Sequence, residues 1–504
     1  MQQQGKGTSN DSSNSVRSRA SSVSSTTHQK QKLHRELVWR DVLGAHILTR
    51  NGEHMNAPID LNAVKKTETY VLGVFACPAN HMRKDKVEAG ARKKRHLLEL
   101  FYQFQGDQLQ DVNELRKWIN FLADPRSESQ LQKVQSVFEL TAEERPAREF
   151  LVIINPVGGA GKGVQTYENK VAPVLKYAGI DVKVEITKRA GHATEIITNM
   201  PLNLYDCVLS VGGDGSLSEI TQGLMTRPDW NQAIRQPIGI IPSGSGNGLS
   251  HSMLYQSQEK AKPINAAFAL AKGSPHEIDI ASVRNGKETM YSFLSFEWAA
   301  IADVDVQSEK LRALGGLRFG VTFVHHIFLT KNEYPGTLWY LEDDPEQPMV
   351  EPPRYFDTHD PNSTEYPKLD LIDCDPNDKA KLGGTWKEVK SHFRILWVMS
   401  ISHASYDAIV APEAQLDDGY NYITYVDGSD FPRSELLPVL LAMEDGSHIK
   451  RESVHHVRTR AWKLVPDRPN DTLCVDGELF PGPAVESQVH RGFGRVMTLP
   501  RTIE

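Results

Sequence analysis

The sequence predicts an α/β domain followed by an antiparallel β domain, and three observations support this prediction. Three short apolar runs, each ending in a glycine-rich turn, lie between Leu151 and Gly248. The segments between these runs have helical patterns, which gives the alternation of a parallel sheet. From about Pro275 the alternation stops, and runs rich in β-branched and aromatic residues predict strands without intervening helices.

The order of these patterns along the 504 residues predicts several domains. Residues 1–35 are rich in Ser, Gln and Thr, so they bury too little apolar surface to order, and we expect a disordered tail. Residues 36–125 form a small module, 148–274 the α/β domain, and 275–504 the antiparallel β domain. Within the last domain, the Pro- and Asp-rich residues 342–381 predict a disordered, exposed insertion.

The module over residues 36–125 combines short strands with a closing amphipathic helix over 113–122. This pattern resembles a pleckstrin-homology-like module with a regulatory or membrane-binding role. A basic stretch before its last strand is a candidate for contact with anionic lipid headgroups, and the alternative is a solvated basic loop. Its members are Lys84, Lys86, Arg92, Lys93, Lys94 and Arg95.

The glycine-rich turns are the strongest functional signal. Glycines at the carboxyl ends of buried parallel strands let the backbone approach a ligand, and free N–H groups there form an anion-binding concavity. Three such turns side by side would hold a polyphosphate. They are Asn155-Pro-Val-Gly-Gly-Ala-Gly161, Gly212-Gly-Asp-Gly215 and Pro242-Ser-Gly-Ser-Gly-Asn247.

Neither of the two common phosphate-loop motifs is present. In a Gly-x-x-x-x-Gly-Lys-Ser/Thr loop, Pro156 would occupy the position of the first glycine and Gly163 that of the hydroxyl residue. No Gly-x-Gly-x-x-Gly follows a predicted strand, so the dinucleotide fingerprint is missing as well.

Asp214 stands between glycines at a strand end, where a carboxylate should repel phosphate. An acid there is explained if it binds Mg²⁺ or takes a proton from an attacking hydroxyl. The alternative for an isolated Asp-Gly is a turn or helix cap. With two further glycine-rich strand ends nearby, we favour the chemical role. Glu219 fits a capping box that opens the next helix, so a structural role is at least as well supported there.

The three glycine motifs resemble the nucleotide-binding signatures of the diacylglycerol/sphingosine kinase family. Two further stretches, Gly223–Trp230 and Ile301–Lys310, are similar to its sphingosine (long-chain base) kinase branch. The resemblance implies a Rossmann-like catalytic nucleotide-binding domain over 148–274 and a lipid-binding C-terminal β-sandwich over 275–504. It also implies ATP as phosphate donor with Mg²⁺, and Asp214 as the catalytic residue. It also implies these nucleotide contacts: Asn155, Gly158, Gly159, Gly161, Thr187, Gly213, Gly215, Ser245, Gly246, Asn247, Arg312, Arg318, Asp476, Gly477 and Glu478.

The stretch after Asp303 separates this branch from other lipid kinases. If it is helical, Asp305, Glu309 and Arg312 fall on one charged face, for which a solvated salt-bridging face is the alternative. The resemblance aligns Asp305 with the acid that binds the substrate amine, and Arg312 and Arg318 with arginines on the phosphates. It also makes Asp476 a nucleotide or magnesium contact, although a hairpin Asp-Gly turn is the alternative there.

The implied activity is ATP-dependent phosphorylation of the primary hydroxyl of sphingoid long-chain bases. A diacylglycerol or ceramide kinase is the alternative within the family. It differs in its substrate, which lacks a free amine for Asp305 to bind. An NAD kinase shares a Gly-Gly-Asp-Gly loop but needs no lipid slot. An inactive lipid-binding adaptor is the non-enzymatic alternative, and the retained Asp214 and intact third loop argue against it.

Composition adds limits on partners and location. A formal net charge of −7 argues against nucleic-acid binding. Four dispersed cysteines, Cys77, Cys207, Cys374 and Cys474, indicate reduced thiols of a cytoplasmic protein. Neither a signal-like N-terminus nor an apolar run of membrane-spanning length occurs, so we expect peripheral membrane contact. Oligomeric state, including a homodimer, is left open.

Overall fold

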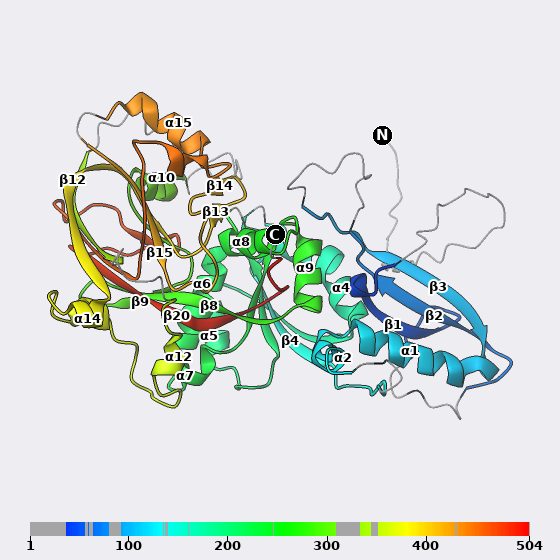
Figure 1. Ribbon diagram of the computed structural model, residues 1–504. Helices are drawn as coiled ribbons and strands as arrows, with labels where there is room; N and C mark the ends of the chain where they lie inside the picture. Colours follow the sequence, from blue (N-terminus) through cyan, green and yellow to red (C-terminus); the bar gives the residue numbers. More distant parts are fainter. Residues whose placement is uncertain are drawn as a thin grey trace, which may run out of the picture. The chain divides into compact units, whose positions relative to one another are not determined.

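The computed structural model describes residues 37–55, 59, 64–79, 92–134, 136, 140–159, 161–244, 246–308, 333–343, 351–428 and 431–502 (Figure 1). The predicted tail over residues 1–35 therefore lies outside the described residues. Within the described part, three strands form a sheet of their own, and fifteen form a second, continuous sheet that carries both of the other predicted domains.

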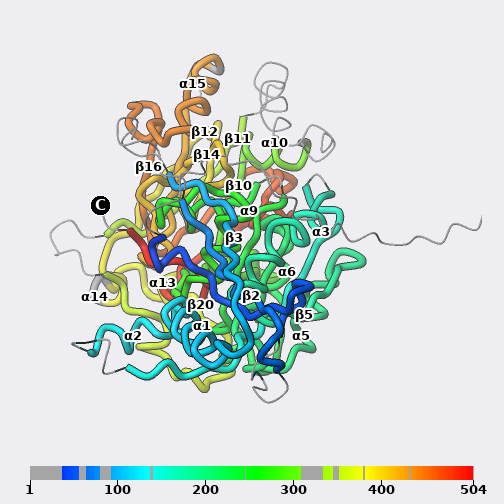
Figure 2. The backbone as a smooth tube through the Cα atoms, turned by 90° about the vertical axis from the view of Figure 1, so that its right-hand side faces the viewer, coloured from blue at the N-terminus to red at the C-terminus, as the bar shows by residue number. Residues whose placement is uncertain are grey.

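The N-terminal module is a three-stranded antiparallel sheet with one long helix (Figure 2). Strands β1 (Val42–Thr49), β2 (Thr69–Ala76) and β3 (Leu98–Gln105) pair in sequence order, and α1 (Leu109–Ala123) follows. Asn120 joins the helix to the sheet: its side chain accepts a hydrogen bond from Ala45 N–H and donates one to Ala45 O. The predicted helix is present, but three strands do not confirm a pleckstrin-homology-like module.

Arg95 corrects the prediction that the whole basic stretch faces lipid. Its guanidinium is buried, with Nη2 2.6 Å from a Glu259 carboxylate oxygen and Nη1 2.7 Å from Asp41. It also lies over the Phe268 ring. A side chain held by two carboxylates and a ring cannot reach a headgroup. Lys84 and Lys86 lie outside the described residues.

The nucleotide domain is built on four parallel strands in the order β5-β4-β6-β7. They are β4 (Arg148–Ile154), β5 (Ile180–Ile186), β6 (Cys207–Gly212) and β7 (Ile238–Pro242). The helical segments between and after them are α3 (Gly163–Thr166), a π-helical turn (Tyr167–Val171), α4 (Ala172–Tyr177), α5 (His192–Thr198), α6 (Asp214–Met225), α7 (Trp230–Ala233), α8 (Gly248–Gln256) and α9 (Pro263–Lys272).

Alternation along β4 explains why this sheet is covered on both faces. Leu151 and Ile153 belong to a core cluster with residues of α5 and α6, whereas Phe150, Val152 and Ile154 belong to a second cluster with residues of α4 and α9. Successive side chains of a strand point to opposite faces, so a continuous apolar run needs an apolar layer on each side. The sequence prediction of buried parallel strands is confirmed.

The C-terminal part is antiparallel, as predicted. Its central pairings are β8 with β20, β11 with β12 and β17, and β12 with β10 and β15. Its strands are β8 (Ser274–Arg284), β9 (Thr289–Ser292), β10 (Ser295–Ala299), β11 (Tyr334–Asp343), β12 (Gly384–Met399), β13 (His403–Ser405), β14 (Ala408–Ile409), β15 (Asn421–Asp427), β16 (His455–Thr459), β17 (Ala461–Pro466), β18 (Cys474–Val475), β19 (Glu478–Leu479) and β20 (Val485–Thr498).

Strand β20 joins the two parts of the sheet. It pairs along β8 and also makes a parallel bridge, Val496 with Ile238, to β7. The last strand of the chain therefore lies next to the last strand of the nucleotide domain, so the two lobes share backbone hydrogen bonds. No helix of the described residues is long and apolar enough to cross a bilayer.

Residues 351–381 correct the prediction of a disordered insertion over 342–381. They hold three short helices, and Tyr355 and Ile372 are buried. The indole N–H of Trp230 donates to Thr364 O at 3.0 Å, and Asp373 accepts from Arg284 at 2.8 Å. The segment is ordered because its few apolar side chains pack into the core despite the high Pro and Asp content. The helices are α12 (Tyr355–Thr358), α13 (Asp370–Asp373) and α14 (Lys379–Leu382), while residues 344–350 lie outside the described part.

Candidate functional site

The three glycine-rich turns meet at one edge of the parallel sheet, because they follow the carboxyl ends of β4, β6 and β7. Their backbones touch. A methyl group built on Gly159, whose φ is +58°, would lie 2.5 Å from Ser243 O, and one built on Gly244 would lie 2.5 Å from Gly213 Cα. Side chains at these points would separate the loops, which explains why glycine is needed there.

Asn155 fixes the first turn and ties it to the second. Its Oδ1 accepts hydrogen bonds from Val157 N–H at 3.1 Å and Gly158 N–H at 3.0 Å, and its Nδ2 donates to Ser216 Oγ at 3.1 Å. An Asn side chain that replaces backbone partners in this way is a common turn device. Asn155 therefore shapes the loop that was predicted to hold phosphate.

Asp214 is the first residue of α6, and its carboxylate contacts the first residues of α8. It is 8% exposed and accepts hydrogen bonds from Gly248 N–H at 2.8 Å and Leu249 N–H at 3.3 Å. Burial raises the pKa of Asp214, while these backbone donors lower it. The expected helix-cap alternative is thus partly right, because Asp214 caps a helix, but that helix is α8 rather than its own.

Most of the predicted site residues line one cavity of about 950 Å³. It lies between the glycine turns and the wall formed by β10, α10 (Ala300–Ser308), β12 and the β18–β19 turn. The predicted residues that line it are Asn155, Gly158, Gly159, Gly213, Asp214, Gly215, Gly246, Asp305, Asp476, Gly477 and Glu478. Across this cavity a methyl group built on Gly215 would lie 3.4 Å from Glu478 Oε1.

Three predicted residues lie elsewhere, and three more lie outside the described part of the chain. Gly161, Thr187 and Asn247 are described but do not line the cavity. The Thr187 hydroxyl faces Ile154 O at 3.4 Å, and Asn247 exchanges hydrogen bonds with the backbone of Gly244 inside the third turn. Ser245, Arg312 and Arg318 lie outside the described residues.

One wall of the cavity is rich in carboxyl groups. Asp305, Glu297 and Glu478 line it, and these acids add to burial, the main cause, in raising the pKa of the buried Cys474 thiol. Asp303 also acts on that thiol, but both of its oxygens accept hydrogen bonds, from Tyr334 and from Thr472. A wall of this charge favours a cationic group on the ligand.

Asp476 faces the protein more than the cavity. Its carboxylate accepts hydrogen bonds from Ser292 Oγ at 2.6 Å and from the N–H groups of Phe293, Leu294 and Ser295 at 3.3, 3.1 and 3.0 Å. Burial raises its pKa to about 6 despite these donors. With four partners Asp476 is suited to holding the turn between β9 and β10, so the geometry does not favour its predicted contact with metal.

The apolar part of the cavity lining was not predicted in detail. It is formed by side chains of α10, of α15 (Leu436–Leu441) and of one residue that follows α15, and they are Ile301, Val304, Leu437, Leu440, Leu441 and Met443. Sequence reasoning also missed Glu297 and Trp397. A signal for Glu297 was available, because it is the only charged residue in Ser295-Phe-Glu-Trp-Ala299, an otherwise buried strand.

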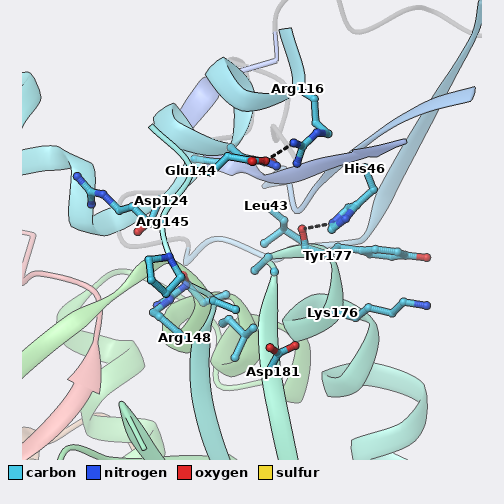
Figure 3. Close-up of a pocket in the computed structure, with 18 of the residues that line it drawn as sticks. Leu43, His46, Arg116, Asp124, Glu144, Arg145, Arg148, Lys176, Tyr177 and Asp181 are labelled. Carbon is cyan, nitrogen blue, oxygen red and sulfur yellow. Dashed lines mark hydrogen bonds and ion pairs between the residues drawn. The ribbon is translucent and has the colours of Figure 1, made fainter. Parts of the chain in front are cut away.

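A second cavity, of about 1280 Å³, lies between the N-terminal module and the nucleotide domain (Figure 3). Its lining mixes both signs of charge, and Arg116 pairs with Glu144 across it. His46 Nε2 donates to Tyr177 O at 3.1 Å. None of the glycine turns reaches it, so the smaller cavity is the candidate active site although this one is larger.

The candidate site has the features that a nucleoside triphosphate requires. Bare backbone approaches the cavity at three glycine turns, and a Cβ would fill space at Gly159 and Gly244. Among the described residues, no group of three or more His, Cys, Asp or Glu side chains is arranged to hold a metal ion by itself. Mg²⁺ that accompanies ATP usually takes phosphate oxygens among its ligands and needs only one or two carboxylates from the protein.

The chain is similar to known proteins over both of its larger parts. Residues 149–283 match the family model described as the diacylglycerol kinase catalytic domain, and 384–498 match the YegS C-terminal NAD kinase beta sandwich-like domain. These matches confirm the predicted α/β catalytic domain and C-terminal β-sandwich.

Several curated relatives span most of the chain. Sphingosine kinase 1 of Mus musculus and sphingosine kinase 1 of Homo sapiens are each 32% identical over 365 residues, which are 69% of this chain and 90% of each relative. Sphingosine kinase 1 of Arabidopsis thaliana is 27% identical over 71% of this chain and 74% of its own length.

Proposed function

The chain belongs to the sphingosine kinases of the diacylglycerol kinase family and is an ATP-dependent sphingoid base kinase, and we propose that its reaction takes place in the cavity built on Asp214. One observation carries the proposal. The glycine turns, the acidic wall and the apolar side chains of α10 and α15 line a single cavity of about 950 Å³. These three surfaces match a polyphosphate, an ammonium group and an alkyl chain.

We assign the triphosphate of ATP to the glycine turns. Gly158, Gly159, Gly213, Gly215 and Gly246 present backbone to the cavity, where N–H groups and the absence of side chains favour close contact with phosphate. Asn155 and Asn247 support this by fixing the first and third turns. The assignments of Gly161, Thr187, Ser245, Arg312 and Arg318 stay predictions.

We propose that Mg²⁺ accompanies the nucleotide and offsets phosphate charge during transfer. Asp214 and Glu478, which face the cavity beside Gly215, are the carboxylates best placed to hold it. Asp476 is less suited because four donors already occupy its oxygens.

The catalytic base we assign is Asp214. Each oxygen of its carboxylate accepts one backbone hydrogen bond, which leaves further lone pairs toward the cavity. The primary hydroxyl of the base attacks the γ-phosphorus, an oxygen–phosphorus bond forms, the bond to the β-phosphate oxygen breaks, and Asp214 receives the hydroxyl proton. Burial, which raises the pKa of Asp214, makes it a better proton acceptor.

Asp305 is assigned to the ammonium of the lipid, and the side chains from α10 and α15 to its tail. Entry of the lipid implies peripheral membrane contact. Leu441 and Leu479 support this proposal, because both line the cavity yet are 58% and 62% exposed, as expected for an apolar rim that faces a bilayer. A cytoplasmic location and a homodimer stay predictions.

A lipid panel tests the proposal. Purified protein with radiolabelled ATP should phosphorylate sphingosine and sphinganine but not ceramide or diacylglycerol, which carry no ammonium group. Asp305→Asn should lower kcat/KM for sphingosine by about 100-fold, since a charge-assisted contact contributes about 1.5–3 kcal/mol, while the KM for ATP stays the same. Equal activity on ceramide, or a fully active Asp305→Asn, would contradict the assignment.

A further inference from the structure

Glu297 lies in the cavity on the strand that forms its acidic wall. The alternation of β10 explains its position: Phe296 and Trp298 point into the main core, whereas Ser295 and Glu297 point to the other face and line the cavity. Glu297 is 7% exposed, and its Oε1 accepts a hydrogen bond from Ser295 Oγ at 3.3 Å. Its other oxygen, Oε2, is buried without a hydrogen-bond partner.

Trp397 is the cross-strand neighbour of Glu297. The two residues face each other in the antiparallel pairing of β10 with β12, and both line the cavity. The indole N–H of Trp397 is also buried without a partner. It lies close enough to favour the charged form of Glu297, but the two groups do not make a hydrogen bond of ordinary geometry.

A donor and an acceptor that do not satisfy each other in a hydrogen bond of ordinary geometry thus lie side by side on two residues of the cavity wall. Buried polar groups normally have partners, so this pair predicts a ligand group that accepts from the indole and donates to the carboxyl. A hydroxyl does both, whereas an ammonium only donates and a phosphate only accepts.

Charge supports a hydroxyl over a second contact with the ammonium. Burial, and after it the charge of nearby Asp305, raises the pKa of Glu297 well above its usual range. A carboxyl group held toward its neutral form binds an ammonium weakly but still pairs with a hydroxyl. Asp305 and Glu297 then have separate ligand groups.

We propose that Glu297 and Trp397 form a subsite for a secondary hydroxyl of the sphingoid base, on C3 or C4, and so make the kinase select bases by their hydroxyl groups. This inference rests on the proposed function of the cavity. The primary hydroxyl is directed to Asp214, the ammonium to Asp305, and the secondary hydroxyl to the Glu297–Trp397 pair.

The test uses three saturated C18 bases that differ only in hydroxyl content: 2-amino-octadecan-1-ol, sphinganine and 4-hydroxysphinganine. The wild-type enzyme should prefer at least one hydroxylated base over 2-amino-octadecan-1-ol by about 10- to 100-fold in kcat/KM, because the deoxy base leaves buried polar groups unpaired. Glu297→Ala and Trp397→Phe should each bring that ratio close to one.

Glu297→Gln is the matched control. It keeps the shape and hydrogen-bonding capacity of the side chain but cannot carry charge, so it should retain most of the ratio. If Glu297 acted by charge on the ammonium, Gln and Ala would lower kcat/KM equally for all three bases, and the inference would be overturned. A wild-type ratio near one, as expected if water alone fills the subsite, would overturn it too.

The assay distinguishes failure of the proposed function from failure of the subsite. If no base is phosphorylated by the wild-type enzyme, the proposed function fails. If bases are phosphorylated but Glu297→Ala keeps the wild-type ratio, only the subsite fails. The thermal unfolding midpoint and ADP binding of each variant show whether a change in the ratio comes from the cavity or from the fold.

Discussion

Three buried carboxyl groups near the cavity differ in how many partners the protein supplies. Asp476 accepts hydrogen bonds from four donors, Asp214 from two backbone N–H groups, and Glu297 leaves one oxygen without a partner. The capacity of each carboxyl group to accept a further hydrogen bond from a ligand is therefore largest for Glu297 and smallest for Asp476. The roles we assign follow this capacity: Asp476 holds a turn, Asp214 holds a turn and takes a proton, and Glu297 binds a ligand.

The sequence alone could not reveal these differences. Asp214 and Asp476 both occur as Asp-Gly at the end of an apolar run, so the pattern predicts the same kind of role for both. What separates them is the turn at Phe293 and Leu294, which a strand far away in the sequence brings to Asp476. Glu297 belongs to no motif, and its one signal, a single acid in an apolar strand, does not say which ligand group it meets.

His490 makes a residue-scale prediction about pH. It is 3% exposed, its Nε2 lies 2.8 Å from Ser282 Oγ, and burial lowers its pKa to about 3. The unfolded chain binds this proton below pH 6.5, so the stability from neutral His490 is present above that pH and is lost as pH falls toward 3. At pH 5 the loss is about 2 kcal/mol.

Comparison of His490→Gln with the wild type isolates this contribution from that of other buried groups. The free energy of unfolding from urea titrations at pH 7 and pH 5 should fall by about 2 kcal/mol more in the wild type than in the variant. An equal change in both proteins would show that His490 does not bind its proton differently in the two states.

At the scale of elements, the glycine turns are the part that sequence reasoning predicted best. The carboxyl ends of parallel strands lie at the same edge of a sheet. Glycine-rich turns that follow three such strands therefore meet there, which the local pattern and the topology predict together. A methyl group built on Gly213 would meet only Gly244 Cα, at an ordinary 3.4 Å. The tight contacts are at Gly159 and Gly244.

Gly159→Ala therefore tests the contact between turns. Its φ of +58° and the 2.5 Å separation from Ser243 O both oppose a side chain, so the first turn must move away from the third. We expect the KM for ATP to rise by at least about 10-fold, with a stability loss of about 1–3 kcal/mol. Gly52→Ala is the control, because Gly52 also has a positive φ, +83°, but lies outside the cavity with nothing within 4 Å of the added methyl group. An equal rise in KM in both variants would contradict the account.

At the scale of the whole molecule, long-range contacts decide features that local patterns misjudge. Residues 351–381 look disordered in sequence yet supply Tyr355 and Ile372 to the core. Arg95 looks like part of a basic surface loop, yet it joins the N-terminal module to the nucleotide domain through Glu259, which is 0% exposed. In both cases the contacting residues are far away in the sequence, so local composition alone led to the wrong predictions of a disordered insertion and a basic surface loop.

Arg95→Met should lower the free energy of unfolding by about 3–5 kcal/mol, because it leaves the Glu259 charge buried and unpaired. Adding Glu259→Gln should restore part of the loss. Urea titration measures both, with exposed Lys94→Ala as a control expected to change little. An Arg95→Met protein as stable as the wild type would show that the ion pair does not hold the module in place.

The most direct measurement of the central claim is turnover by Asp214→Asn with sphingosine and radiolabelled ATP, alongside ADP affinity and the unfolding midpoint. Asn can still accept one of the two backbone hydrogen bonds, so we expect a fold that survives with a loss of about 1–3 kcal/mol and nearly unchanged ADP affinity. Turnover should fall by at least about 100-fold, since the amide cannot take the hydroxyl proton. A variant that folds, binds ADP and still phosphorylates sphingosine at the wild-type rate would contradict the account.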